Sequence, residues 1–362
     1  VRKGLLDVLE HMAKAPVTET ELRRAKAALL SEIDKTLNDP EKLAVQLSES
    51  MANGDWRLFF LNRDRIEALS IQDVQRVAQN YFKESNRTYG QFVPTASPDR
   101  ITAPKPVNVA ELVQSYTGRA AVSAGENFDV TPAAIEKRTL RTTLPGGLKL
   151  ALIAKKTRGE TVSGTLRLNL GDEKNLFGQA VTADLVGDML LRGTTSLNRS
   201  DLSAKLDELK AQLSMSADGQ TVTVRFDTLR KHLPEVLQLV RDALRSPAFA
   251  ATEFDMVIKE NLAQIDNQRN EPQGMGSQAV GKAMDVYRPG DMRAALSFDE
   301  LTARLKAAKL DELKRFHAQF YGADHAEFAL IGDFDAAAVQ TQMQTLFGNW
   351  KSKAAYQRLV SL

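Results

Sequence analysis

The chain has 362 residues, a length that favours about two domains. It carries 48 Lys and Arg against 46 Asp and Glu, and 43% of its residues are hydrophobic. This balance is typical of folded globular proteins and excludes both a disordered chain and the strong basic excess of many nucleic-acid-binding proteins. No apolar run reaches the roughly 20 residues that a membrane-spanning helix needs. The absence of cysteine excludes disulfides, thiolate metal ligands and cysteine nucleophiles.

Residues 1–93 are predicted to be mostly helical. Thr18 and Glu21 have the Thr-x-x-Glu spacing of a capping box, in which two side chains satisfy free backbone amides at the start of a helix. That helix continues to Leu37 with apolar residues three and four positions apart, and it ends before Pro40. The other elements expected here are helices over 5–14, 41–53 and 71–82 and a strand over 88–93.

A proline-rich stretch follows this helical region. Between residues 94 and 132 lie five of the twelve prolines: Pro94, Pro98, Pro104, Pro106 and Pro132. Such a composition stiffens a connector and prevents it from forming a packed core. We therefore expect four segments: a first domain region at 1–94, an interdomain linker at 95–137, a complete domain at 138–350, and the start of a connection to a following domain at 351–362.

From residue 138 onward, blocks of strands and blocks of helices follow each other. The expected strands are 140–144, 148–154, 162–170, 213–217, 221–229 and 328–331. The expected helices are 177–191, 200–212, several between 232 and 320, and 336–346. Asp218-Gly219 predicts a tight hairpin turn, because glycine tolerates the positive φ that such a turn needs. Without regular βαβ alternation, the pattern favours an α+β fold with a mainly antiparallel sheet packed against helices.

Two parts of the chain resemble each other. Residues 20–40 contain TEL, ID and NDP, and residues 252–272 contain TEF, ID and NEP at the same spacing. Farther on, VAQNY at 77–81 and HAQFY at 317–321 each precede an expected strand. Any two amphipathic helices share part of this pattern, but the common order of helix, proline stop, helices and strand favours a duplication.

The duplication has a physical consequence for residues 1–94. They correspond only to the second half of the later region, so they are the C-terminal half of a domain whose leading strands we expect upstream of Val1. A half-sheet exposes hydrogen-bonding edges and an apolar face. We therefore expect the missing domains of the same protein, or a second copy in a homo-oligomer, to cover it.

Four segments carry a family resemblance. Residues 54–88, with GDWRLFF, DRIEAL and SNRT, resemble the end of a second domain, and LPGGLK at 144–149 resembles the LPNGL opening of a domain. DLVGDMLLRGT at 184–194 resembles the zinc-motif helix HLLEHMLFKGT. FHAQFY at 316–321, followed by IGD at 331–333, resembles the usual end of a domain. In this order, they resemble a bacterial tandem-domain zinc peptidase of the pitrilysin/insulysin type, an inverzincin related to the mitochondrial processing peptidase.

The metal motif departs from that family pattern. In active members, H-x-x-E-H directs two histidines toward zinc from one helix face, and the glutamate activates the bound water. The matching positions here are Asp184, Gly187 and Asp188. The family's third ligand, a glutamate on a later helix, aligns with Gln264, one turn from Glu260. Both imidazoles are missing, so the resemblance implies no catalytic residue, no bound zinc and no cofactor in this chain.

Other candidate sites are weak. Asp184 and Asp188, four residues apart on a helix, could hold Mg²⁺ or Ca²⁺ weakly, but a solvated or amide-bonded pair is the favoured interpretation. His317 and His325 lie near the last expected strand, and we interpret each as a structural or surface histidine.

The resemblance implies a function for a longer parent protein. That parent is expected to be a zinc metalloendopeptidase of four similar α+β domains that close around a chamber, with zinc in an upstream domain. This chain is expected to be its non-catalytic middle portion, which walls the chamber and holds peptide substrates, for example by adding them as a strand to a sheet edge. We expect neither a nucleic-acid partner nor a membrane-spanning segment. Bacterial members are often exported, so the resemblance implies a periplasmic or secreted protein, with the cytoplasm as the alternative.

Two other interpretations stay open. The chain could belong to an inactive pseudo-peptidase that serves as a scaffold or partner subunit, as respiratory-complex core subunits of this family do. It could also be a stand-alone binding module of duplicated α+β domains. An H-x-x-E-H motif upstream of Val1 would indicate the enzyme, and a monomer that stays in solution without a partner would favour the module.

Overall fold

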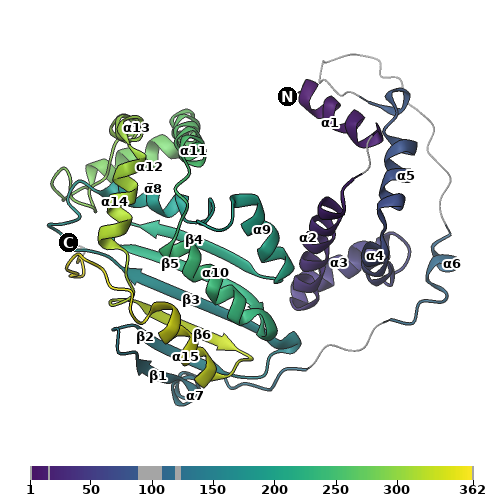
Figure 1. Ribbon diagram of the computed structural model, residues 1–362, viewed down its shortest axis with the longest axis horizontal. Coiled ribbons are helices and arrows are strands. Elements are labelled where there is room, and N and C mark those ends of the chain that lie inside the picture. The colour runs from purple at the N-terminus through teal and green to yellow at the C-terminus, as the bar shows by residue number, and fades with distance from the viewer. Residues whose placement is uncertain (1, 15–16, 89–107, 119–123, 361–362) are drawn as a thin grey trace. The chain divides into compact units, whose positions relative to one another are not determined.

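The computed structural model describes residues 2–14, 17–88, 108–118 and 124–360, and the chain divides into two units, Val1–Ala121 and Val122–Leu362 (Figure 1). The predicted strand over 88–93, apart from Thr88, lies outside the described residues. The same holds for four of the linker prolines, Pro94, Pro98, Pro104 and Pro106.

The first unit is helical throughout its described part. Its helices are α1 (Arg2–Lys14), α2 (Glu19–Leu37), α3 (Pro40–Ala52), α4 (Leu58–Ala68), α5 (Ile71–Tyr81), the 3-10 turn η1 (Glu84–Asn86) and α6 (Val109–Val113). The capping box predicted for α2 is present, because the Glu21 amide donates to Thr18 Oγ1 and the Thr18 amide donates to the Glu21 carboxylate. Ser70 and Asp73 form the same box at the start of α5.

The second unit is built on a six-stranded mixed sheet. Its strands are β1 (Leu140–Thr143), β2 (Lys149–Ala154), β3 (Thr161–Asn169), β4 (Gln212–Asp218), β5 (Thr221–Leu229) and β6 (Glu327–Gly332). They are arranged in the order β1-β2-β6-β3-β5-β4, and every neighbouring pair is antiparallel except β2 with β6. The predicted α+β fold with a mainly antiparallel sheet is confirmed.

Helices cover one face and one side of this sheet. They are α7 (Pro132–Arg138), α8 (Ala180–Met189), α9 (Arg199–Glu208), α10 (Leu233–Arg245), α11 (Ala251–Asn270), α12 (Pro272–Ala283), α13 (Phe298–Ala307), α14 (Leu310–Phe320) and α15 (Ala336–Phe347), with the 3-10 turns η2 (Arg158–Glu160) and η3 (Arg230–His232). Helices α10 and α15 lie across one face, and α8, α11, α12 and α13 gather on the β4 side (Figure 1). In the described part of the chain, no helix has the length and apolarity needed to span a membrane.

Strict alternation along the strands separates the two faces of the sheet. Leu166 on β3 and Phe328 on β6 are neighbours on the buried face, where they join one continuous apolar core. Thr165 and Ala329, one position away, are neighbours on the opposite face. The helices therefore cover one face, and the other face is open in the described part of the second unit.

Helices α1–α5 of the first unit match α10–α14 of the second in order, and their lengths agree to within one residue. The first set has 13, 19, 13, 11 and 11 residues, and the second has 13, 20, 12, 10 and 11. Both α3 and α12 also begin with a proline, Pro40 and Pro272. The repeat seen in the sequence therefore has a counterpart in the helices.

Candidate functional site

Helix α8 carries the positions that match the metal motif of the resemblance. Most of its side chains are buried, including Leu185, Val186 and Met189. Asp184 and Asp188 are the two exposed residues of this helix, and they lie four residues apart on one of its faces. The structure therefore brings these two carboxylates together, as their spacing predicts.

Gly187 lies where α8 approaches β4 most tightly. A Cβ atom at this position would lie 2.5 Å from the Cβ atom and 3.0 Å from the backbone nitrogen of Ala217 on β4. Real Cβ atoms do not approach other atoms so closely, so the helix would have to move away from the strand. The position that holds the catalytic glutamate in the family pattern therefore has no room for a side chain here.

Asp184 sits in an environment that disfavours its charged form. Although its carboxylate reaches solvent, its pKa is raised to about 6, and burial by the surrounding protein is the largest cause. The nearby carboxylates of Asp188 and Asp218 contribute to this rise, and the backbone amide of Gly219 opposes it. The sequence identified Asp218 only as a turn residue and did not indicate that its charge lies next to α8. The predicted hairpin between β4 and β5 was the one feature that could have pointed to Asp218.

Tyr321, which follows α14, is a second residue that the motif did not indicate. Its side chain is 2% exposed, and its hydroxyl has no hydrogen-bond partner among the described residues. Burial and the nearby Asp184 both raise its pKa, so it is a neutral phenol at physiological pH. Its ring packs against His317, whose Nε2 lies 2.7 Å from the Leu244 carbonyl oxygen.

The two candidate histidines differ in their environments. Because a carbonyl can only accept, Nε2 of His317 carries the proton and donates it to Leu244, and burial lowers the pKa of this ring. These are the surroundings of a structural histidine. His325 is exposed, and its ring lies 4.9 Å from that of Tyr356.

Side-chain hydrogen bonds connect α11 to α8 and to Arg192, which lies just after the end of α8. Asn261 Nδ2 donates to Asp188 Oδ2 at 3.0 Å. Glu260 accepts two hydrogen bonds from the guanidinium of Arg192, and this pairing lowers the pKa of Glu260. Gln264, the position aligned with the third metal ligand, is exposed on α11 one turn away. Side-chain pairs therefore link the two helices that share the metal in the family pattern.

These donors do not fit a zinc site. Zinc in proteins prefers imidazole and thiolate ligands, and the facing helices offer two aspartates, an amide and a glutamate already paired with arginine. The described residues contain no group of three or more His, Cys, Asp or Glu side chains placed to hold a metal ion. We therefore derive no metal-assisted step from this helix pair.

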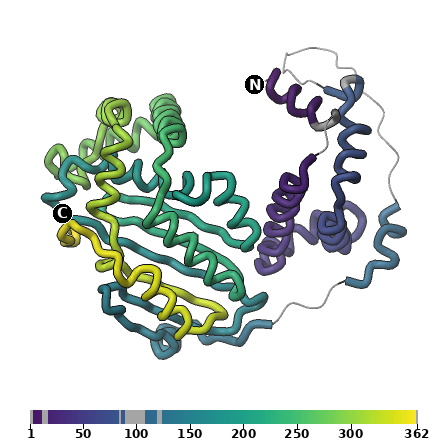
Figure 2. Tube along the Cα trace, in the orientation of Figure 1, coloured from purple at the N-terminus to yellow at the C-terminus, as the bar shows by residue number. Residues whose placement is uncertain are grey.

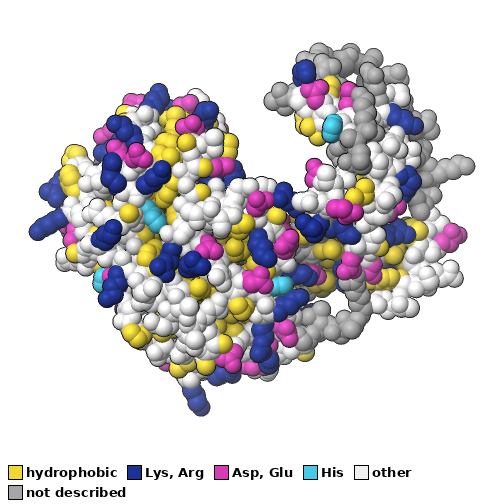
Figure 3. Space-filling view, in the orientation of Figure 1, with side chains coloured by type: hydrophobic (Ala, Val, Ile, Leu, Met, Phe, Trp, Pro, Cys, Tyr) yellow, Lys and Arg dark blue, Asp and Glu magenta, His cyan; other side chains and the backbone are white. Residues whose placement is uncertain are grey.

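The open face of the sheet forms a shallow groove. Two adjoining hollows of about 450 and 790 Å³ run over β1, β2, β6, β3 and part of β5. Small side chains such as Ala151, Thr165 and Ala329 form the floor, and Arg141 and Arg225 stand among the longer ones around it. The charged side chains that line the groove carry both signs: Arg141, Lys149, Arg167, Arg225, Asp227 and Glu327. On the helix-covered face shown in Figure 3, the described Lys and Arg side chains are likewise interspersed with Asp and Glu.

The fold and the altered motif define a class, a peptidase-like α+β domain whose motif helix carries Asp184, Gly187 and Asp188 where the family pattern has two histidines and a glutamate. Residues 157–286 match the family described as "Insulinase (Peptidase family M16)", and residues 307–360 match "Peptidase M16 inactive domain". The chain belongs to this M16 family, the insulinase/pitrilysin family. The resemblance recognised in the sequence is confirmed.

Solved structures support the fold. A peptidase M16 inactive domain from Pseudomonas fluorescens superposes with a TM-score of 0.52 at 18% identity, over 61% of this chain and 54% of that chain. A protease from Helicobacter pylori superposes with a TM-score of 0.51 at 16% identity, over 60% of this chain and 52% of that one.

Curated relatives with similar sequences include plant proteins. The probable mitochondrial-processing peptidase subunit alpha-1 of Arabidopsis thaliana is 26% identical over 144 residues. The mitochondrial-processing peptidase subunit alpha of Solanum tuberosum is 24% identical over 208 residues. These matches cover 39% and 54% of this chain but 28% and 40% of the relatives, so the chain spans less than half of their length.

Proposed function

We propose that this chain is a non-catalytic portion of a zinc metalloendopeptidase and holds extended peptides for a catalytic centre elsewhere in the parent protein. One observation carries the proposal: in the described part of the chain, an open sheet face with an unpaired edge lies on an M16 domain whose own motif helix lacks the two histidines and the glutamate of the family pattern. The zinc would belong to an upstream domain. The parent would act in the periplasm or outside the cell.

The domain assignment is part of this proposal. Residues 1–94 would be the C-terminal half of one peptidase-like domain, 95–137 the linker, 138–350 a complete domain and 351–362 a connection to a following domain. The match of α1–α5 with α10–α14 supports the first of these. The remaining domains of the same protein, or a second copy, would cover the apolar side chains that the first unit exposes.

The peptide would add to β1 as a further strand. In the described residues, β1 pairs with β2 on one side only. The Leu144 amide donates to the Leu148 carbonyl at 2.8 Å, on the side of β2. Along a strand, the backbone N–H groups of successive residues point to opposite sides. Thr142 therefore faces β2 as Leu144 does, and Arg141 and Thr143 turn their amides to the open edge. Side chains of the added strand would rest in the adjoining groove.

A pair of variants at Thr143 tests this function. The probe is fluorescein-labelled unfolded casein, and we expect the wild-type chain to bind it and not to cleave it, with or without added zinc. Thr143→Pro removes an outward amide from an exposed edge position, where proline is tolerated. Since one hydrogen bond contributes about 1 kcal/mol, binding should weaken by about fivefold or more. Thr143→Ala keeps the amide and should bind as the wild type does.

The outcomes separate this function from its alternative. Zinc-dependent cleavage by this chain would overturn the non-catalytic role, and equal binding by the two variants would overturn strand addition. The alternative is an inactive pseudo-peptidase that acts as a scaffold or partner subunit. The match of residues 307–360 to an inactive domain and the likeness to alpha subunits favour it. A chain that binds no unfolded casein would support that alternative.

A further inference from the structure

The last described segment, residues 351–360, forms neither helix nor strand, yet it is bound to the second unit along its length (Figure 2). Its first part is held at α14 and the following loop. The Ser352 amide donates to Asp324 Oδ1 at 2.9 Å, and the amides of Lys353 and Ala354 donate to the Gln319 carbonyl at 3.0 and 3.1 Å. These contacts direct the chain toward the turn between β4 and β5.

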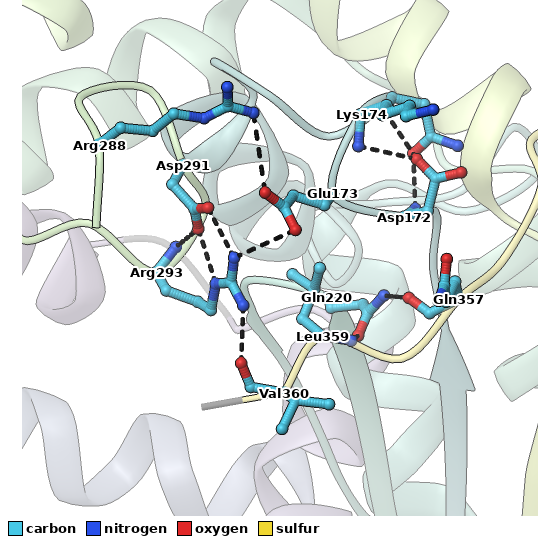
Figure 4. Close-up of polar contacts among 11 residues, drawn as sticks. Asp172, Glu173, Lys174, Gln220, Arg288, Asp291, Arg293, Gln357, Leu359 and Val360 are labelled. Atoms are coloured by element: carbon cyan, nitrogen blue, oxygen red, sulfur yellow. Dashed lines mark hydrogen bonds and ion pairs between the residues drawn. The ribbon is translucent and has the colours of Figure 1, made fainter. Parts of the chain in front are cut away.

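Gln220, in that turn, binds the segment as a neighbouring strand would (Figure 4). Its Nε2 donates to the Gln357 carbonyl at 2.6 Å, and its Oε1 accepts from the Leu359 amide at 2.9 Å. The Gln357 amide donates to the Gly171 carbonyl at 3.0 Å, and the same carbonyl accepts from Gln220 Nε2. The side-chain amide of Gln220 thus takes the place of a peptide group in a neighbouring strand, because it donates to the carbonyl of residue 357 and accepts from the amide of residue 359.

Asn175 and Arg293 bind the two ends of this stretch. Asn175 Nδ2 donates to the Ala355 carbonyl at 2.9 Å, and Arg293 Nη1 donates to the Val360 carbonyl at 2.7 Å. Both contacts again reach main-chain oxygen atoms. Five hydrogen bonds therefore hold main-chain groups of residues 355–360.

The binding groups are fixed in place before they meet the segment. Arg293 donates Nε and Nη2 to the two carboxylate oxygens of the buried Asp291, at 2.8 and 2.7 Å. Its guanidinium also lies over the Tyr287 ring, 4.4 Å from the centroid. Its Nη2 lies 3.6 Å from a carboxylate oxygen of Glu173 (Figure 4). Asn175 Oδ1 accepts a hydrogen bond from the Asp172 amide at 2.7 Å. Groups held in this way lose little freedom on binding a chain.

None of these five hydrogen bonds uses a side chain of the segment. Gln357, Arg358 and Val360 are exposed, Leu359 is half-buried, and the half-buried Tyr356 has its ring 4.9 Å from that of His325. Because the bonds go to main-chain atoms, a different sequence in the same extended form would satisfy them equally. The site also adjoins the altered motif, since Gln220 follows Gly219, whose amide lies close to Asp184.

We propose that Gly171, Asn175, Gln220 and Arg293 form a main-chain cradle, a binding site for an extended polypeptide of unrestricted sequence, with residues 355–360 as its built-in occupant. This proposal depends on the proposed function in one respect only, that the ligand is a polypeptide. The cradle lies in a different part of the domain from the edge of β1. A peptide from elsewhere would bind by displacing residues 355–360.

The test uses the full chain with its segment weakened. Gln357→Pro combined with Leu359→Pro removes both amides that the cradle accepts and leaves the cradle intact. The probe is a fluorescein-labelled peptide with the sequence of residues 351–360, KSKAAYQRLV. By fluorescence anisotropy, this variant should bind the probe about tenfold more tightly than the wild type, whose cradle is filled. Arg358→Pro, at an exposed position between the two, should behave as the wild type.

Three further measurements decide the outcome. A scrambled probe should bind the double variant within about threefold of the original, and a probe N-methylated at the positions of Gln357 and Leu359 should not bind. Adding Gln220→Glu, which keeps the shape but cannot donate, should abolish binding, and Gln212→Ala should not. In the wild type, hydrogen exchange should show a protected Leu359 amide and a fast Arg358 amide. Absent or sequence-dependent binding, or fast exchange at Leu359, would overturn the cradle and leave the Thr143 result unaffected.

Discussion

The two units share a run of five helices in the same order and of nearly equal lengths but differ in what those helices cover. In the second unit, α10 and α14 contribute to a continuous core built on the sheet. In the first unit, the apolar residues buried in the described part are Leu22, Phe59, Ala78 and Val113. Many others there stay exposed: Leu5, Val8, Leu29, Val45, Met51, Trp56, Val77, Tyr81 and Phe82. An amphipathic helix therefore gains its stability from the surface it packs against and little from its own sequence.

The largest expected effect is a difference in stability between the units. A core of domain size supports about 5–15 kcal/mol, and four buried side chains support little once chain entropy is counted. The two tryptophans, Trp56 and Trp350, report on one unit each. In the Trp350→Phe variant, fluorescence reports the unfolding of the first unit through Trp56, and in the Trp56→Phe variant it reports the second unit through Trp350. In urea, the Trp56 transition should therefore have its midpoint at a lower denaturant concentration than the Trp350 transition. Coincident transitions would show that the units unfold together and would break the comparison.

The second prediction concerns α8, an element without a counterpart among the described helices of the first unit. Gly187→Glu would place a side chain against Ala217 and a charge at a buried position. We expect a loss of about 4 kcal/mol or more from the free energy of unfolding, measured on the Trp350 transition. The control is Gln264→Glu, which also introduces a glutamate carboxylate but at an exposed site, and it should change stability by less than about 0.5 kcal/mol.

The third prediction compares one leucine from each unit. Leu168 on β3 is fully buried, and Leu29 on α2 is 52% exposed. Leu168→Ala leaves a cavity under the helices and should cost about 2–5 kcal/mol on the Trp350 transition. Leu29→Ala should cost less than about 0.5 kcal/mol on the Trp56 transition. A large fall in the free energy of unfolding for Leu29→Ala would mean that Leu29 packs in an apolar core that its exposed fraction does not indicate.

Much of the fold could be predicted because local chemistry determines it. The capping box at Thr18, the proline at the start of α3 and the hairpin near Gly219 each depend on residues a few positions apart. The strand order could not be predicted, because β6 lies between β2 and β3 although most of the second unit separates it from both in sequence. Such pairing depends on long-range packing that no local pattern contains.

The candidate site shows the same division. The pair Asp184 and Asp188 followed from helical spacing alone. The charge of Asp218 beside them and the bond from Asn261 required knowing which strand and which helix pack against α8. The main-chain cradle was out of reach for the same reason, because Gln220 and Arg293 have no motif that marks them as peptide-binding residues.

The smallest effect expected is a pH dependence caused by Asp184. Its pKa rises from an ordinary value of 3.8 to about 6 in the folded chain. Between about pH 4 and pH 6 the folded chain therefore binds this proton more tightly than the unfolded chain, and the free energy of unfolding falls as the pH rises. Asp184→Asn keeps the shape without the charge, so it should stabilise the second unit above pH 6 and not below pH 4. Because the carboxylate reaches solvent, the gain should stay below about 1 kcal/mol.

Urea unfolding of the Trp56→Phe chain at several pH values measures this difference through Trp350. Asp218→Asn provides the matched comparison, because it removes a neighbouring charge and leaves the burial of Asp184 unchanged. In that variant the fall in stability should be displaced to lower pH without disappearing, since burial is the larger cause of the raised pKa. An Asp184→Asn chain whose gain is the same at pH 4 and pH 7 would show that the sheet and its turn do not perturb this carboxylate. The environment of α8 would then differ from that of an exposed helix in the first unit by its packing alone.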